Sequence, residues 1–327
     1  MSSIRSDVYL ISLLSTISSQ LNRYLALVIF LFGIIGNLLN IIVFSQRTLR
    51  SNPCSYLFLL ASICYLLSLC SGIFPRFLST WDADLGNTNE ILCKLRIYIY
   101  FNSLTIAFWL IALATIDRWF LSSQDVSRRN RSSLKNVKRS FVCLLILSSL
   151  FESQQIFCYE ANLTNTPLKC YSKTVGCAIL SDVSFAFVTV LIPVTLMLIF
   201  GLLILSNIRR SQIRLNPITS YSNEGINQIY VHNGRVNPQR RTDRHLLSML
   251  LAQIILILLF SFPFAFSKFY STITRYLPKS SLQSTTESFI FNLFLLFINV
   301  ASGMPFYIYT LTGGHVFRKT LANLFRK

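Results

Sequence analysis

The chain has 327 residues, of which 53% are hydrophobic and 13% charged, whereas about 25% of the residues in an ordinary soluble domain are charged. Its 30 Lys and Arg residues outnumber 12 Asp and Glu residues and give a formal net charge of +18. The apolar excess excludes a disordered or collagen-like chain, and eight Cys are too few for a disulfide-framework mini-protein. The composition therefore predicts an all-α membrane protein.

Residues 1–23 are expected to form a short extracellular tail. The stretch Tyr9–Ile17 is Ser-rich and has only one Arg before it. A charged segment followed by a small-residue cleavage site is missing, so we do not interpret it as a signal peptide.

Seven long apolar segments follow the tail, and a span needs roughly 20 such residues to cross a bilayer core of ~30 Å. Most are apolar on every face, whereas buried helices of a soluble bundle would be shorter and carry polar stripes. We expect the spans at about residues 24–46, 54–77, 92–121, 139–158, 181–208, 244–270 and 287–311, with a cytoplasmic amphipathic helix at 312–327. The sequence thus predicts a seven-transmembrane helix bundle over residues 24–311, with a short C-terminal amphipathic helix.

The basic residues orient the predicted spans. One face of the membrane receives twenty Lys and Arg and four acidic residues, and the other receives ten and eight. Short loops rich in Lys and Arg remain cytoplasmic, so we expect an extracellular N-terminus, a cytoplasmic C-terminus and a location in the plasma membrane. The basic residues are dispersed over short loops, and we therefore expect no nucleic acid as a partner.

The loop after the fourth span contains Asn162-Leu163-Thr164, an N-glycosylation acceptor sequence. It falls on the face that the charges make extracellular. A second match at Asn130 falls on the cytoplasmic face and is disregarded. Asn162 is therefore a candidate glycosylation site.

The third span carries the most specific motif in the chain. Asp117-Arg118-Trp119 stands at its cytoplasmic end, and Cys93 lies 25 residues before Arg118 at its outer end. In a seven-span chain this pattern resembles the rhodopsin-like (class A) G-protein-coupled receptors. Further matches are Gly36-Asn37, Pro193, Pro263, Pro305 and the C-terminal amphipathic segment. The resemblance covers essentially the whole chain, although its details mark a divergent member.

The resemblance implies a cytoplasmic latch between the third and sixth spans. Arg118 would pair with Asp117 and with Asp243 at the start of the sixth span, and release of the pair would open a crevice for a G protein. A charge at a membrane helix end is costly unless it is paired. The three residues could instead mark helix boundaries, and Arg240, Arg241 and Arg244 could compete for Asp243.

Cys93 has three candidate partners in the loop after the fourth span, namely Cys158, Cys170 and Cys177. An extracellular loop is oxidising and permits disulfides. The resemblance implies that the loop is joined to the third span, and Cys170 fits this better than Cys177, which falls almost at the start of the fifth span. Cys158 and Cys177 could then form a second bridge.

Three prolines lie where the resemblance places helix kinks. Proline inside a helix removes one backbone hydrogen bond and clashes with the preceding turn. Helix kinks are expected at Pro193, Pro263 and Pro305, and those at Pro263 and Pro305 would let the inner halves of the sixth and seventh spans move. Proline can also be merely tolerated in membrane helices.

Several positions depart from the family pattern. Cys64 replaces the usual Asp of the second span and Met304 the usual Asn before the last proline, so we predict no allosteric sodium site. Ser261 stands in place of the usual Trp of the sixth span. The seventh span lacks the Lys that would anchor retinal. Tyr100 occupies the place of the Asp that binds amine ligands, which argues against a biogenic amine.

The outer halves of the spans supply the candidate ligand pocket. Its members are largely aromatic or apolar with a few polar groups, as small-molecule sites generally are, and many could be packing residues. The candidates are Tyr100, Ser103, Leu104, Glu152, Phe264, Lys268 and Phe294. Glu152 is the intramembrane acid of the fourth span and could bind a cationic ligand group such as a peptide Arg, or mark an early helix end.

These patterns predict a receptor that couples an extracellular, neuropeptide-like ligand to a heterotrimeric G protein. The basic segments 128–139 and 209–244 would contact the G protein, although anionic lipid could also bind them. We expect no catalysis, metal site or cofactor, because the three His are scattered over the cytoplasmic face. A seven-span channel or transporter subunit is the alternative, but it would show internal repeats or charges along a pathway.

Overall fold

The computed structural model describes residues 2–79, 81, 83–123, 125–163, 168–215, 238–274, 277–312, 317 and 321–322, without the side chains of residues 2–5, 48, 209–215 and 238–245. Within these ranges, seven helices are long and apolar enough to cross a membrane. Their bounds are Ser6–Phe44, Pro53–Ser79, Glu90–Ser122, Leu134–Cys158, Val175–Ile208, Leu246–Ile273 and Ser281–Gly303. The predicted seven-transmembrane bundle is confirmed, and the chain is a multi-pass membrane protein.

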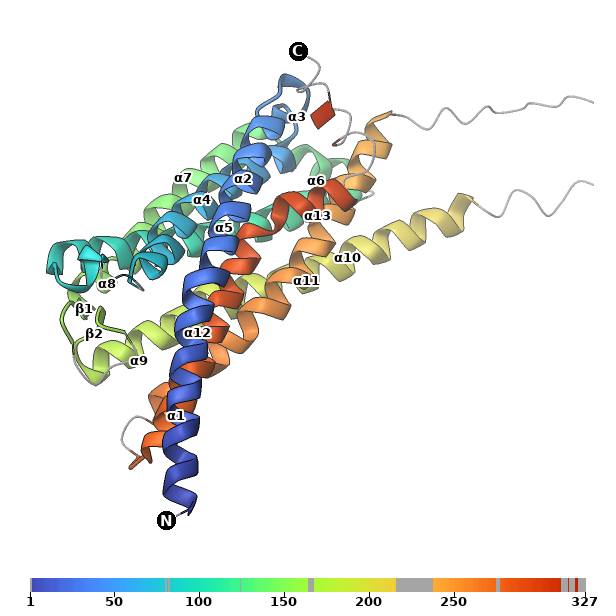
Figure 1. Cartoon of the computed structure of the whole chain (residues 1–327). Helices are drawn as coiled ribbons and strands as arrows, with labels where there is room; N and C mark the ends of the chain where they lie inside the picture. The colour runs from blue at the N-terminus through green and yellow to red at the C-terminus, as the bar shows by residue number, and fades with distance from the viewer. Residues whose placement is uncertain are drawn as a thin grey trace, which may run out of the picture.

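The elements follow one another as Figure 1 shows. In chain order they are α1 (Ser2–Gln20), η1 (Leu21–Leu25), α2 (Ala26–Phe44), α3 (Arg47–Arg50), α4 (Pro53–Ser79), η2 (Leu85–Asn87), α5 (Glu90–Ser122), α6 (Val126–Arg131), α7 (Leu134–Glu152), α8 (Gln154–Cys158), β1 (Tyr159–Glu160), β2 (Tyr171–Ser172), α9 (Val175–Ser184), η3 (Phe185–Leu191), α10 (Ile192–Leu215), α11 (Pro238–Ile273), α12 (Ser281–Gly303) and α13 (Pro305–Thr312).

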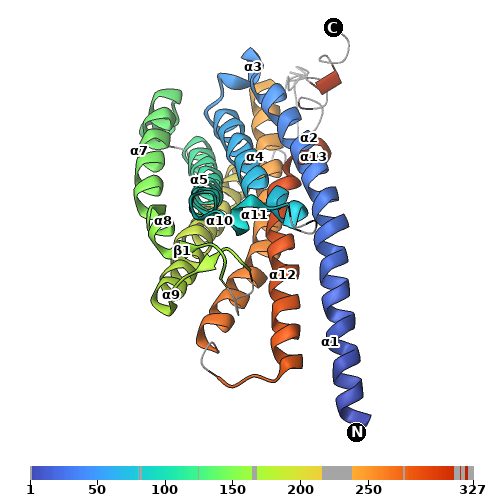
Figure 2. The same ribbon diagram turned by 60° about the vertical axis from the view of Figure 1, so that its left-hand side comes forward.

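The N-terminal tail is helical and continuous with the first span. α1 passes through the π-helical turn η1 into α2, so Ser6–Phe44 form one helix of 39 residues. No Pro precedes Pro53 and no Gly precedes Gly33, and the tail therefore lacks the residues that most weaken a helix. Figure 2 shows α1 lying beside α12.

α5 is the central helix of the bundle and packs against α4, α7 and α10. The side chain of Asn89 caps its first turn by accepting a hydrogen bond from the backbone nitrogen of Leu92 at 3.1 Å. Cys93 lies near one end of α5 and Arg118 near the other, and both side chains are buried. We call the corresponding ends of the bundle the Cys93 end and the Arg118 end.

α2 and α12 approach each other closely at two glycines. A Cβ atom on Gly303 would lie 3.2 Å from the Cα of Gly33, and a Cβ on Gly33 would lie 3.1 Å from the Cα of Gly303. The amide nitrogen of Asn37 donates across the same contact to the carbonyl of Ser302 at 3.0 Å. Small residues and interhelical hydrogen bonds of this kind hold membrane helices together.

The three prolines of the predicted kinks occupy different settings. Pro193 is the second residue of α10, directly after the π-helical turn η3, and Pro305 begins α13 after the chain leaves α12 at Gly303. α11 continues through Pro263 without a break. The chain thus leaves regular α-helical geometry just before two of the three prolines, where the missing amide hydrogen removes a backbone bond.

The segment after α13 belongs only in part to the described residues. Phe317, Leu321 and Ala322 are helical, as expected of the short C-terminal helix, and the other residues of 313–327 lie outside the description. Phe317 is buried, and its ring lies 5.6 Å from that of Phe44 and 6.1 Å from that of Phe306, measured between centroids. This contact fixes the segment to the Arg118 end of the bundle.

Gly303→Ala is expected to lower the melting temperature of the purified protein. The added methyl group would meet the backbone of α2, and overpacking of this kind costs about 1–3 kcal/mol. The matched control is Gly176→Ala, because no heavy atom lies within 4 Å of a Cβ at Gly176. Equal melting temperatures for the two variants in a thermal-unfolding assay would contradict the close contact of α2 and α12.

Candidate functional site

Arg118 is buried at its end of α5, where it contacts the neighbouring Asp117 and a side chain that precedes α4. Its Nη2 atom lies 3.1 Å from Oδ2 of Asp117 and 2.8 Å from Oδ1 of Asn52, which precedes α4. The hydroxyl of Ser132 donates to the other oxygen of Asp117 at 2.5 Å. With 3% and 4% of their surfaces exposed, Arg118 and Asp117 form a partly dehydrated ion pair that ties α5 to α4 and to the turn after α6.

Trp119, the third residue of the motif, points to a neighbouring helix. Its ring lies 5.0 Å from that of Phe200 in α10, between centroids, and the guanidinium of Arg128 lies 5.5 Å from the Trp119 ring. Asp243 belongs to α11, but its side chain lies outside the described residues. The latch between Arg118 and Asp243 therefore stays a prediction.

Two disulfides organise the Cys93 end within the described residues. Cys93 is bonded to Cys170, the partner that the family resemblance favours, and Cys158 is bonded to Cys177. Between the disulfides lies a short antiparallel hairpin, in which Tyr159 of β1 pairs with Ser172 of β2. The hairpin is thereby fixed to α5 on one side and to the start of α9 on the other.

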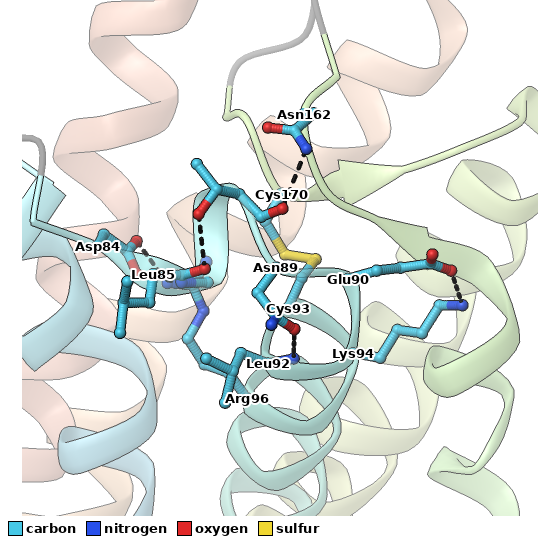
Figure 3. The surroundings of a disulfide bond; sticks show 12 residues. Asp84, Leu85, Asn89, Glu90, Leu92, Cys93, Lys94, Arg96, Asn162 and Cys170 are labelled. Carbon is cyan, nitrogen blue, oxygen red and sulfur yellow. Dashed lines mark hydrogen bonds and ion pairs between the residues drawn. A yellow bond between two sulfur atoms is a disulfide. The ribbon is translucent and has the colours of Figure 1, made fainter.

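Figure 3 shows the Cys93–Cys170 disulfide with the polar contacts around it. Asp84 accepts a hydrogen bond from the backbone of Gly86 at 3.0 Å and pairs with Arg96 at 2.6 Å. The amide nitrogen of Asn162 donates to the carbonyl of Thr88 at 3.0 Å, and the Asn162 side chain is exposed. Thr164 of the acceptor sequence lies outside the described residues. The hydrogen bond between Asn162 and Thr88 joins the loop before α5 to the loop after β1.

A cavity of about 320 Å³ lies at the Cys93 end, between α4, α5, α11, α12 and the hairpin. It is lined by Ser71, Gly72, Arg76, Ser79, Asp84, Asn87, Arg96, Ile97, Tyr100, Phe101, Tyr159, Leu168, Lys169, Cys170, Tyr171, Phe264, Lys268, Phe291, Leu295 and Asn299. Three of the predicted pocket residues, Tyr100, Phe264 and Lys268, are among them. These three side chains are brought together by the fold although they are far apart in the sequence.

The other candidate pocket residues are placed differently. Ser103 and Leu104 of α5 are buried in the packed interior of the bundle, and neither lines a described cavity. Phe294 lines a separate cavity of about 590 Å³ between α11, α12 and the start of α9. The predicted set is therefore divided between one shared cavity, a second cavity and the helix interior.

Glu152 lies at the end of α7 with 1% of its surface exposed. It accepts hydrogen bonds from the hydroxyl of Thr105 at 2.9 Å and from the amide of Gln155 at 3.2 Å. Thr105 in turn lies 2.7 Å from the hydroxyl of Thr189 in η3. The carboxyl group thus joins α5, α7 and, through Thr105, the fifth span, and it lines none of the described cavities.

Sequence reasoning missed several residues of the two ends. Arg76 was counted only as a basic residue of the extracellular face, yet it lies within α4, which continues to Ser79, and it lines the cavity. Asp182 was counted only as an extracellular charge, although it is buried and lies 2.5 Å from Nζ of Lys268. Asn52 had no recognisable signal, since its contact with Arg118 depends on the tertiary fold.

The positions that depart from the family pattern lie in dissimilar surroundings. Cys64 and Ser261 are buried, and the Ser261 hydroxyl has no hydrogen-bond partner among the described residues. Met304 lies between α12 and α13 with 43% of its surface exposed. The predicted absence of a sodium site stays a prediction.

Loss of the Cys93–Cys170 disulfide is expected to destabilise the protein more than loss of Cys158–Cys177. The first closes a loop with a sequence separation of 77 and the second one of 19. For independent loops, the difference in closure entropy is worth about 1 kcal/mol at 25 °C. Thermal unfolding of the paired Cys→Ser variants measures this, and a lower melting temperature for the Cys158/Cys177 variant would contradict it.

The comparison with known proteins identifies the family to which the chain belongs. No curated protein matches it. The family described as 7 transmembrane receptor (rhodopsin family) matches residues 36–309, which include both ends of α5. Its members are receptors rather than enzymes, and membership implies an extracellular ligand and a G protein as partners. The expected resemblance is confirmed, and the chain belongs to the rhodopsin family of seven-transmembrane receptors.

Proposed function

We propose that the protein is a plasma-membrane receptor that couples an extracellular, neuropeptide-like ligand to a heterotrimeric G protein, and that it catalyses no reaction. Family membership over residues 36–309 supports this proposal. The observation that carries it is the buried contact of Arg118 with Asp117 and Asn52 at one end of α5. A buried charge in a membrane protein marks a functional site when its surroundings can rearrange.

The proposed signal is a shift between two arrangements of the helices at the Arg118 end. In the arrangement described here, Arg118 is occupied by contacts inside the bundle. A ligand with higher affinity for a second, open arrangement would increase the population of that state. Arg118 would then be exposed to the G protein, together with the basic segments 128–139 and 209–244. Asp243 is proposed to contribute to the closed arrangement.

The proposed orientation places the Cys93 end outside the cell. The hairpin, both described disulfides and Asn162 lie at that end, and disulfides persist in oxidising compartments. The Arg118 end includes α3 and α6 with their basic residues, as the positive-inside rule requires of a cytoplasmic face. The cavity of about 320 Å³ then lies on the extracellular side and is the proposed ligand site.

Arg118→Ala is expected to reduce G-protein activation by about tenfold or more. The substitution removes the proposed charge-assisted contact between Arg118 and the G protein, which is worth about 1.5–3 kcal/mol, and losing it weakens coupling by at least this factor. The measurement is G-protein dissociation in cells, with and without a library of synthetic neuropeptides.

The control is Arg50→Ala, because Arg50 is an exposed arginine at the same end of the bundle that is absent from the proposed contact surface. Surface expression of each variant is measured in parallel. Equal G-protein activation by wild type and Arg118→Ala, or a peptide-evoked current without G-protein dissociation, would overturn the proposed function.

Asn162→Gln is expected to remove an N-linked glycan. Glycosylation takes place only on the luminal and later extracellular side, so the glycan reports the orientation of the Cys93 end. Wild-type protein should shift to a lower apparent mass after glycosidase treatment, and Asn162→Gln should not. Asn130→Gln, at the second acceptor sequence, is the matched control and should shift as the wild type does. A shift that depends on Asn130 would reverse the proposed orientation.

A further inference from the structure

The cavity at the Cys93 end is lined by more cations than anions. Two of its basic residues have carboxylate partners, since Arg96 pairs with Asp84 at 2.6 Å and Lys268 with Asp182 at 2.5 Å. Arg76 also lines the cavity, and within the described residues it forms no ion pair. A cation in this setting favours an anionic ligand group.

The guanidinium of Arg76 is only partly satisfied by its neighbours. Its Nη1 atom donates to the side-chain oxygens of Asn22 at 3.2 Å and Asn292 at 3.1 Å. Its Nη2 atom is buried and has no hydrogen-bond partner in the described part of the protein. Both partners of Nη1 are neutral, so the positive charge of Arg76 stays uncompensated by them. A buried charged donor without a partner is costly, and an acceptor from a bound molecule would remove that cost.

Two further polar groups in the lining of the cavity are Tyr100 and Asn299. The buried hydroxyl of Tyr100 and the buried side-chain oxygen of Asn299 have no well-formed hydrogen bond among the described residues, and the two side chains interact with each other. Arg76, Tyr100 and Asn299 come from α4, α5 and α12, so three helices each bring a polar group to one cavity. Arg76 and Tyr100 can donate hydrogen bonds, and the oxygen of Asn299 can accept one.

The fold holds the ring of Tyr100 at the edge of this cavity. A Cβ atom at Gly72 would lie 2.4 Å from two carbons of that ring, so the ring rests directly on the backbone of α4. The apolar part of the lining includes Phe264 and Phe291, whose ring centroids lie 5.5 Å apart. The cavity thus combines an aromatic wall with a polar corner.

We infer that this cavity binds a ligand through a single carboxylate, which Arg76 and Tyr100 hold while an apolar group contacts Phe264 and Phe291. The inference rests on the proposed receptor function and names the chemical class of the ligand. Arg presents a planar fork that matches a carboxylate. The guanidinium of Arg76 balances the one negative charge that a carboxylate carries.

The carboxylate can come from the end of a peptide or from a small organic acid. The carboxy-terminal residue of a peptide also carries an amide N–H group, which can donate a hydrogen bond to the side-chain oxygen of Asn299. A volume of about 320 Å³ is at the small end of the range for ligand pockets. The cavity therefore accommodates the end of a peptide rather than a folded segment. Glu152, by contrast, lines no described cavity and has its own hydrogen-bond donors.

The test measures the melting temperature of purified full-length protein with defined probes. One pair of probes is 3-phenylpropionate and 3-phenylpropanamide, and the other is an N-acetylated tripeptide ending in Phe with a free or an amidated carboxy terminus. Both acids have matched neutral amides, so each pair isolates the carboxylate. We expect at least one acid, at up to about 10 mM, to raise the melting temperature by about 2 °C or more, and its amide to have a smaller effect.

Variants assign the effect to Arg76. Arg76→Gln should abolish the rise and Arg76→Lys should reduce it, because Lys retains the charge but not the planar fork. Lys94→Gln is the control. It also removes one positive charge from the Cys93 end of the bundle, but Lys94 does not line the cavity. The melting temperature of each variant without probe verifies that it is folded. The acid that stabilises the protein identifies the source of the carboxylate.

Three results would overturn the inference. They are equal stabilisation by an acid and its amide, a rise that persists in Arg76→Gln, and no stabilisation by either acid. None of these readouts involves a G protein. Failure of the carboxylate inference is therefore distinguishable from failure of the proposed signalling function, which the Arg118→Ala assay measures separately.

Discussion

The fixation of α5 at both of its ends is the constraint on which the rest of the bundle depends. Near one end, the Cys93–Cys170 disulfide joins α5 to the hairpin, and near the other, Arg118 and Asp117 connect it to Asn52 and Ser132. The 25 residues between Cys93 and Arg118 span about 38 Å at the α-helical rise of 1.5 Å per residue. α4, α7 and α10 pack around this length. A change at the cavity must therefore reach the Arg118 end through movements of the surrounding helices relative to a fixed α5.

The spans and the motif of α5 could be predicted from the sequence, because a bilayer imposes long apolar segments and the motif lies at the end of one. The polar interior could not be predicted in the same way. Arg76 was treated only as a charge of the extracellular face, because the partners of its side chain, Asn22 and Asn292, come from distant segments of the chain. The helical structure of the tail was also missed, because a Ser-rich segment has low intrinsic helix propensity and gains its order by packing on α12.

Buried charges are used differently at the two ends of the bundle. Lys268 and Asp182 join α11 to α9, with Thr272 as a further donor to Asp182, so this carboxylate is satisfied by one helix. Such a pair is costly to break because it leaves an uncompensated buried charge. Arg118 instead has an adjacent acid and a neutral amide as its described partners. The Cys93 end thus contains a buried ion pair between two helices, whereas the Arg118–Asp117 pair lies within α5 and contacts other segments through Asn52 and Ser132.

The helix Ser6–Phe44 has a consequence for the surface that the receptor presents to its surroundings. Its 39 residues extend for about 58 Å, nearly twice the ~30 Å thickness of the hydrocarbon core. About half of the helix therefore lies in the headgroup layer or in water when it stands upright in the bilayer. Because this part rests against α12 (Figure 2), it covers that flank of the bundle and adds a helical surface beyond the membrane core.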